Sequence, residues 1–498
     1  MSAIGLSIYD ASFISTLHTY FFVITDLVTS KISLGNNVDR SMAGSSALAK
    51  LNGYEIVNKV ARGLCWLGLL FASGDLWPTV KIGFTFRFTQ LCMLAAAALM
   101  ISRRYQSLRA VTGFRWLYAF ILTIVLELPF SAYPLRSIGY TFWAITDVLT
   151  IVVFVEYFET LKNIERLIRW FTTSFIVIAI FGCVQFVVGL GGHSLFTTEW
   201  WIPGLLPRVN GLSYEPSYYA TYLIVGWIYS AYLLENGAKF PSRRLQLMCF
   251  MSTTIALVIC TSRMGWLMMI LWIVFRLSRA AVLGIVSGVL NRAAFRRIVI
   301  AVLALGAGSS VVLIHQSEMA NSLNDVSFLA QGLGLFGESS HSARPRLDRL
   351  EDTWKVFQRH PIFGVGIGAL PVEIARQSDE GIFNLRDAKM HQGMSIFVEL
   401  LASTGLLGGA IVIGFSLAIM RELKDISSHC TSSLRTPLSA IGWGIVWMVG
   451  ILQFNQNFLR IYLFADLGVL LACISVLKSN KLAIRNTECV DTPLLTSE

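Results

Sequence analysis

The chain has 498 residues, of which 55% are hydrophobic and 14% are charged, and its formal net charge is +10. About a quarter of the residues in soluble domains are charged, so this composition excludes an ordinary soluble protein and indicates a polytopic helical membrane protein. Nucleic-acid binding is not indicated. Most Lys and Arg residues fall in short clusters between apolar runs, as in cytoplasmic loops, and no RNP, zinc or helix-turn-helix pattern accompanies them.

Taken in chain order, the apolar runs predict an all-α fold with about twelve membrane spans. Residues 1–60 form a cytoplasmic or interfacial segment, and residues 478–498 form a cytoplasmic tail. Spans 1–9 lie within residues 61–314, a large periplasmic loop occupies 315–394, and spans 10–12 lie within 395–477. The predicted limits of the spans are 61–78, 82–102, 116–132, 137–157, 170–190, 217–234, 247–262, 264–280, 297–314, 395–420, 438–456 and 461–477.

The run "LMCFMSTTIALVICTSRMGWLMMILWIVF", residues 247–275, contains one charge, Arg263. As a single helix it would be about 43 Å long, whereas the hydrocarbon core of a bilayer is about 30 Å thick. We therefore predict two spans that turn at "TSRMG". With this turn, every basic cluster falls on one side of the membrane together with both termini, as cytoplasmic loops require. Arg263 then faces the periplasm.

Separate segments bring arginines to this outer face. Arg208 stands in "PRVNGLSYEPSYYATYL", just before a span, and Tyr214 and Glu215 at the mouth of that span are candidates for substrate binding. The large loop carries a further group, Arg344, Arg346 and Arg349. Guanidinium groups bind phosphate oxygens through two parallel hydrogen bonds, so we expect a lipid phosphate or pyrophosphate here. The alternative for each arginine is a salt bridge or a side chain that snorkels to the interface.

The large loop carries two further patterns. The segment "HSARPRLDRLEDTWKVFQRH" predicts an amphipathic helix, whose apolar face consists of Leu347, Leu350, Trp354 and Phe357. It is followed by "RHPIFGVGIGALP", in which no Lys-Ser/Thr pair follows the glycines, so a nucleotide cradle is not indicated. We expect these glycines to permit a tight turn packed against the bundle.

His391 stands in "AKMHQGMSIFVELLASTGLLGG", at the outer start of the tenth span. A histidine there can take a proton from a sugar hydroxyl, and the alternative is a helix cap or an interfacial side chain. Asp75 lies in the first outer loop, where many membrane glycosyltransferases keep a catalytic carboxylate. No second acid or Asp-x-Asp metal signature stands near it, so helix capping is the favoured interpretation. We predict no metal site.

Four of these segments occur in the order and loop positions of one family: "RVNGLSYEPSYYATYL", "TSRMGWL", "RLEDTWKVFQRHPIFGVGIGAL" and "HQGMSIFVELLASTGLLGG". Over about residues 60–477 the chain resembles the O-antigen ligase/polymerase superfamily, which contains Wzy-type polysaccharide polymerases and lipid A-core O-antigen ligases. The resemblance implies an inverting glycosyltransferase that needs no metal or cofactor. Its donor is an oligosaccharide on undecaprenyl pyrophosphate, at the periplasmic face of the bacterial inner membrane.

The resemblance also implies roles for residues. The family's diphosphate-binding arginines map onto Arg208 and Arg263, and the histidine that activates the acceptor hydroxyl maps onto His391. A chain-length regulator and a flippase are implied as partners. In ligases the histidine stands about one helical turn closer to the glycine that opens "GLLG" than His391 does, which favours a polymerase of surface-polysaccharide repeat units.

Three alternatives to a polymerase stay open. One is an O-antigen ligase that transfers glycan to lipid A-core. A second is a flippase or transporter of lipid-linked sugars, which the charges on the outer face and the single asymmetric loop disfavour. The third is a scaffold for polysaccharide assembly without chemistry of its own.

Overall fold

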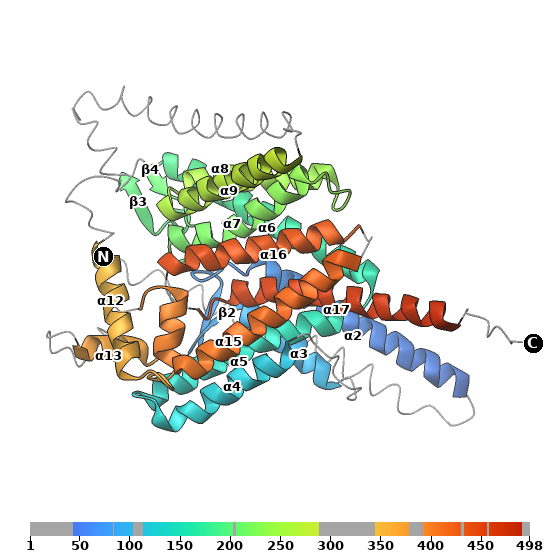
Figure 1. Cartoon of the computed structure of the whole chain (residues 1–498), viewed down its shortest axis with the longest axis horizontal. Helices are drawn as coiled ribbons and strands as arrows, with labels where there is room; N and C mark the ends of the chain where they lie inside the picture. Colours follow the sequence, from blue (N-terminus) through green and yellow to red (C-terminus); the bar gives the residue numbers. More distant parts are fainter. Residues whose placement is uncertain are drawn as a thin grey trace, which may run out of the picture.

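The computed structural model describes residues 43–82, 84–102, 113–202, 206–287, 344–377, 391, 393–429, 433–455 and 458–490. This part of the chain is a bundle of long helices with two short β-hairpins (Figure 1). It confirms the predicted all-α, polytopic fold. The predicted ninth span, 297–314, and the first part of the large loop, 315–343, lie outside the described residues.

The bundle helices follow the apolar runs in chain order. They are α2 (Ala43–Leu70), α3 (Phe88–Ser102), α4 (Phe114–Glu127), α5 (Pro134–Tyr157), α6 (Leu161–Leu190), α7 (Pro216–Glu235), α8 (Arg243–Ile259), α9 (Arg263–Ser287), α15 (Ile396–His429), α16 (Arg435–Ile451) and α17 (Ile461–Val490). The shorter elements are the hairpins β1 (Thr79–Ile82) with β2 (Phe84–Arg87) and β3 (Glu199–Ile202) with β4 (Leu206–Arg208), the helices α12 (Arg344–Arg359) and α13 (Leu370–Gln377), and the single 3-10 turns η1 (Leu128–Phe130) and η2 (Leu452–Phe454).

Within the described residues, five helices are long and apolar enough to cross a membrane. They are Pro134–Tyr157, Leu161–Leu190, Ile396–Ile426, Arg435–Phe454 and Ile461–Ser479. A helix needs about 20 apolar residues to span the hydrocarbon core, and each of these segments meets or nearly meets that length. They agree with a polytopic membrane protein. The number of spans, about twelve by sequence, stays a prediction.

Helix α7 lies in the middle of the bundle and is buried along most of its length against α6, α8 and α16. A Cβ added at Gly226 of α7 would lie 2.4 Å from the ring of Phe175 on α6, so only glycine lets these helices approach this closely. Small residues of this kind bring helices into contact in membranes, where lipid is as apolar as the side chains. The segment that leads into α7 is therefore held at a fixed place.

Two predicted boundaries have different outcomes. The run 247–275 is divided as predicted, because α8 and α9 are separate helices and α9 begins at Arg263. The first predicted span, 61–78, is wrong in its limits. Helix α2 ends at Leu70, and the chain then turns into the hairpin β1–β2. Pro78 prevents a helix from reaching the predicted limit, since it has no N–H for a helix and disfavours helical backbone at the preceding residue. The helix itself ends eight residues earlier, at Leu70.

Helix α12 is amphipathic as predicted, but its buried face is rotated from the predicted one. Thr353, Val356 and Phe357 are buried, and the helix packs against α15. Leu347 and Trp354 are 65% and 43% exposed, so the prediction is wrong for these two. Successive residues are about 100° apart around a helix, which places Leu347 and Trp354 together on one flank of the buried stripe.

Helix α15 is kinked at Gly405, which has a φ of +63°. The glycine-rich loop after α12 supplies hydrogen bonds on both sides of this kink. Leu406 N donates to Pro361 O at 2.8 Å, and Val365 N donates to Ala402 O at 3.0 Å. The loop's own glycines also have positive φ values, which other residues rarely adopt. The expected tight turn packed against the bundle is therefore confirmed.

Candidate functional site

The loops that carry the candidate residues meet at one end of the bundle, near the hairpins and α12 (Figure 1). Ser213 Oγ, just before α7, donates to Ser73 O in the loop after α2 at 2.9 Å. Ser395 Oγ, just before α15, donates to Gln453 Oε1 on η2 at 2.7 Å. Segments that are far apart in the sequence thus contact one another through buried polar side chains.

A buried glutamine of α6 holds the "RVNGLSYEP" segment in place. Gln185 Oε1 accepts hydrogen bonds from the backbone amides of Asn210 and Gly211, at 3.1 and 2.9 Å. Asn210 is fully buried and donates in turn to Ser213 O at 2.6 Å. Gly211 has a φ of +57°, and a Cβ there would lie 2.6 Å from the ring of Tyr219. The segment is therefore a rigid support for the residues at its two ends.

Arg208 lies at the start of this segment, on β4. It pairs across the hairpin with Glu199, its register partner on β3. Its Nε also donates to Thr261 Oγ1 at 3.2 Å, in the turn between α8 and α9. The structure thus joins Arg208 directly to the turn that ends at Arg263. Arg208 was predicted to bind diphosphate or, alternatively, to form a salt bridge. One edge of its guanidinium already contacts an acid, so both interpretations stay open.

Arg263 is the first residue of α9, and its side chain is exposed. Among the described residues it has neither an ion pair nor a hydrogen-bonding partner. The turn before it is tight, since Thr261 has a φ of +52° and Ser262 Oγ accepts from Gly265 N at 3.4 Å. An exposed guanidinium on such a turn is available to an anionic ligand.

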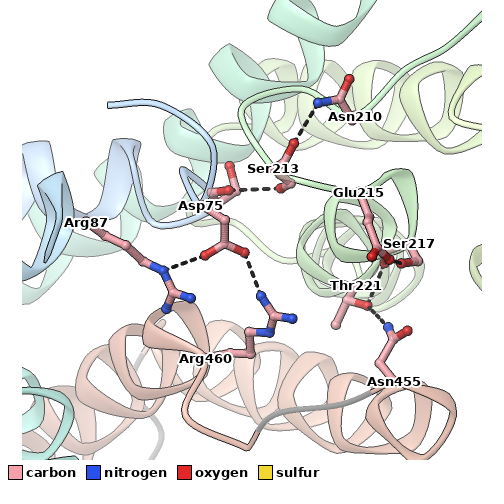
Figure 2. A network of polar contacts seen from close by, with 10 residues as sticks. Asp75, Arg87, Asn210, Ser213, Glu215, Ser217, Thr221, Asn455 and Arg460 are labelled. Atoms are coloured by element: carbon pink, nitrogen blue, oxygen red, sulfur yellow. Dashed lines mark hydrogen bonds and ion pairs between the residues drawn. The ribbon is translucent and has the colours of Figure 1, made fainter. Parts of the chain in front are cut away.

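Glu215 and Tyr214 lie at the other end of the segment, at the start of α7. Glu215 is half-buried, occupies the N-cap position and accepts a hydrogen bond from Ser217 Oγ at 3.0 Å. Tyr214 is 59% exposed. One helical turn after Ser217, Thr221 Oγ1 accepts a hydrogen bond from Asn455 Nδ2 at 2.8 Å (Figure 2). This bond ties α7 to the chain after η2. The polar side of α7 therefore faces the same end of the bundle.

His391 is half-buried in a non-helical segment, because α15 begins only at Ile396. Helical turns were counted between His391 and Gly405 in the sequence. This count does not apply, because His391 does not lie on the helix that contains Gly405. The segment is anchored on α12, where Thr353 Oγ1 accepts from Met394 N at 3.2 Å. This bond ties the residues between His391 and α15 to α12.

The three loop arginines belong to α12. Arg349 is exposed and lies one turn before Thr353, on the side of the helix that meets the His391 segment. Arg344 and Arg346 lie in the first turn, and their side chains are outside the described part of the structure.

The structure adds a cluster that the sequence did not predict. Asp75 lies between two arginines, with Oδ1 2.7 Å from Arg87 Nε and Oδ2 2.8 Å from Arg460 Nη1 (Figure 2). The side chains of Asp75 and Arg460 are each 5% exposed, and that of Arg87 is 16% exposed. The guanidinium of Arg460 also lies over the ring of Tyr218, 3.6 Å from its centroid. The interpretation of Asp75 as a helix cap is wrong.

The charge of Arg460 is maintained despite its burial. Burial alone would lower the pKa of Arg460, but the Asp75 carboxylate, with Tyr218 and Tyr462 nearby, raises it above its ordinary value. Sequence reasoning missed this cluster because two of its members, Asp75 and Arg460, are 385 residues apart. The available signal was that the predicted topology puts both Arg87 and Arg460 on the outer side of their spans, where the positive-inside pattern places few basic residues.

Residues 247–413 match the family model described as O-antigen ligase. The match covers about a third of the chain, and this region is similar to the O-antigen ligase family. This match confirms the resemblance to the O-antigen ligase/polymerase superfamily, and it supports a ligase- or polymerase-type membrane enzyme that acts on glycans. No curated protein matches the chain.

The matched region, residues 247–413, supplies only some of the candidate residues. It contains the turn at Arg263, α12, the glycine-rich loop and His391. The hairpin with Arg208 and the cluster around Asp75 and Arg460 lie outside it, yet they contact the same end of the bundle. Within the described residues, no group of three or more His, Cys, Asp and Glu side chains is placed to hold a metal ion.

Proposed function

We propose that the protein polymerises oligosaccharide repeat units of a surface polysaccharide, such as O-antigen, capsule or exopolysaccharide. The donor glycan is carried on undecaprenyl pyrophosphate, and the reaction takes place at the periplasmic face of the inner membrane. One observation supports this proposal: Arg208 Nε donates a hydrogen bond to Thr261 Oγ1, in the turn that ends at Arg263. A chain-length regulator and a flippase are the proposed partners.

The reaction balances without a further reactant. The oxygen of an acceptor hydroxyl forms a bond to the anomeric carbon of the donor, from the face opposite to the leaving group. The bond between that carbon and the diphosphate oxygen breaks, and its electron pair leaves with undecaprenyl diphosphate. The hydroxyl proton passes to His391. The guanidinium groups of Arg208 and Arg263 stabilise the negative charge that develops on the leaving diphosphate.

An O-antigen ligase is the second candidate, and the description of the matching family favours it. The two functions differ in the acceptor. A polymerase extends another lipid-linked repeat unit, whereas a ligase transfers the glycan once, to lipid A-core.

The test is turnover by the purified protein in the presence of EDTA, with a defined undecaprenyl-pyrophosphate oligosaccharide as donor. A ladder of products on the carrier lipid supports the polymerase. A single addition, made only when lipid A-core is supplied, supports the ligase. The absence of any glycosyl transfer with either acceptor contradicts both, and a deletion strain that accumulates repeat units on the inner leaflet would instead indicate a flippase.

A further inference from the structure

The Asp75 cluster has hydrogen-bonding capacity that its own residues do not use. Two guanidinium groups share one carboxylate, and the shared contacts occupy only Arg87 Nε and Arg460 Nη1. Among the described residues, the buried Arg460 Nε has no partner, and Arg87, whose side chain is 16% exposed, contacts Asp75 through its Nε. Unpaired buried donors on a charged group are costly. The cluster is therefore built to accept a further anionic group.

The neighbouring groups fill only part of this capacity. Tyr218 forms a side-chain hydrogen bond with Arg460, but Arg460 Nε has no partner among the described residues. Asp147 on α5 interacts electrostatically with Arg87, but neither of its carboxylate oxygens has a hydrogen-bonding partner among the described residues. An added anion would supply acceptors that these side chains do not.

The cluster is built from elements other than those that carry Arg208 and Arg263. Its residues come from the loop after α2, from β2 and from the residue before α17, whereas Arg208 and Arg263 lie on β4 and at the start of α9. The two groups are nevertheless neighbours, because Leu76 N donates to Leu212 O at 3.0 Å between their loops. One end of the bundle thus holds two separate cationic clusters.

We infer that the Asp75–Arg87–Arg460 cluster is a second diphosphate site, which holds the carrier lipid of the acceptor glycan. The inference rests on the proposed function, because a polymerase joins two glycans that are each carried on a lipid diphosphate. The charges of the two clusters indicate which of them binds the donor's carrier lipid and which binds the acceptor's. The leaving diphosphate gains negative charge and needs a cation without an acid partner, such as Arg263. The acceptor's diphosphate is not displaced, and it suits arginines that already share Asp75.

Binding stoichiometry tests this inference without knowledge of the sugar. The probe is undecaprenyl diphosphate itself, titrated into purified protein in phosphatidylcholine nanodiscs. We expect two molecules per chain for the wild type, one for Arg87→Gln and one for Arg263→Gln. One molecule per chain in the wild type, or two in Arg87→Gln, overturns the second site and leaves the proposed function standing. No binding at all overturns the proposed function as well.

Two further variants separate binding from folding. Arg87→Lys keeps a cation beside Asp75 but removes the planar fork, so we expect about a ten-fold weaker second binding step with an unchanged unfolding temperature. Arg276→Gln is the matched control. It removes a guanidinium that pairs with Glu235 at the opposite end of α7, and it should retain two bound molecules. If Arg276→Gln loses one molecule, the stoichiometry does not report on the Asp75 cluster and the inference fails.

Discussion

At the scale of single residues, the arginines at the polar end of the bundle differ in their partners. Arg208 contacts Glu199 and Thr261, and Arg460 contacts Asp75. Arg263 has no acid partner among the described residues. An arginine held by an acid is partly neutralised, whereas an unpaired one acts with its full charge on a ligand. The largest catalytic effect is therefore expected at Arg263.

Arg263→Lys should fail nearly as badly as Arg263→Ala. Lysine keeps the charge but cannot donate two parallel hydrogen bonds to a diphosphate, and loss of one such donor typically lowers kcat by about 100-fold or more. The measurement is the rate of product formation from the lipid-linked oligosaccharide, with the amount of protein in the membrane as control. Wild-type turnover by the lysine variant would contradict the diphosphate role.

His391→Ala should abolish polymer formation while the protein remains in the membrane. Removal of a general base typically lowers the rate by about 100- to 10,000-fold. His360, which is exposed at the end of α12, offers a matched control, and His360→Ala should keep its activity. Polymer of normal length in the His391→Ala strain would show that another group takes the proton.

At the scale of elements, sequence reasoning succeeded where one physical quantity decided the outcome. The division of the 247–275 run followed from the thickness of the bilayer and from the side on which basic residues lie. It failed where a local turn competed with apolar composition, as after Leu70, where the predicted span gives way to a turn and then to the hairpin β1–β2. The exact face of α12 also required its packing partner, α15, because periodicity alone left Trp354 on the wrong side.

Gly405→Ala should destabilise the protein by about 2 kcal/mol or more. The residue has a φ of +63°, and an added Cβ would lie 2.0 Å from Ile362 O, so the loop after α12 would lose its hydrogen bonds to α15. Thermal unfolding of the purified protein measures the effect. Gly63→Ala, within α2, is the control, because a Cβ there meets no atom within 4 Å. Equal unfolding temperatures for the two variants would contradict the role of the kink.

At the scale of the whole molecule, the polar end is assembled from segments that only the complete bundle brings together. Asp75 and Arg460 are separated by 385 residues, and no periodicity or motif links them. Sequence reasoning could place each residue on a side of the membrane, but it could not pair them, since pairing depends on which helices are neighbours. The cluster therefore joins the loop after α2 to the start of α17.

The ion pairs of this cluster predict that two substitutions differ in how much they destabilise the protein. Asp75→Ala leaves two buried guanidinium groups without their acid, and removal of one partner of a buried ion pair typically costs about 3–5 kcal/mol. Arg460→Met should cost less, because Asp75 keeps its contact with Arg87 and the methionine can fill the space over Tyr218. Thermal unfolding in nanodiscs without added carrier lipid measures both. If Arg460→Met lowers the unfolding temperature more than Asp75→Ala does, the acid is not the centre of the cluster, and the packing of Arg460 on Tyr218 holds the two ends of the chain together instead.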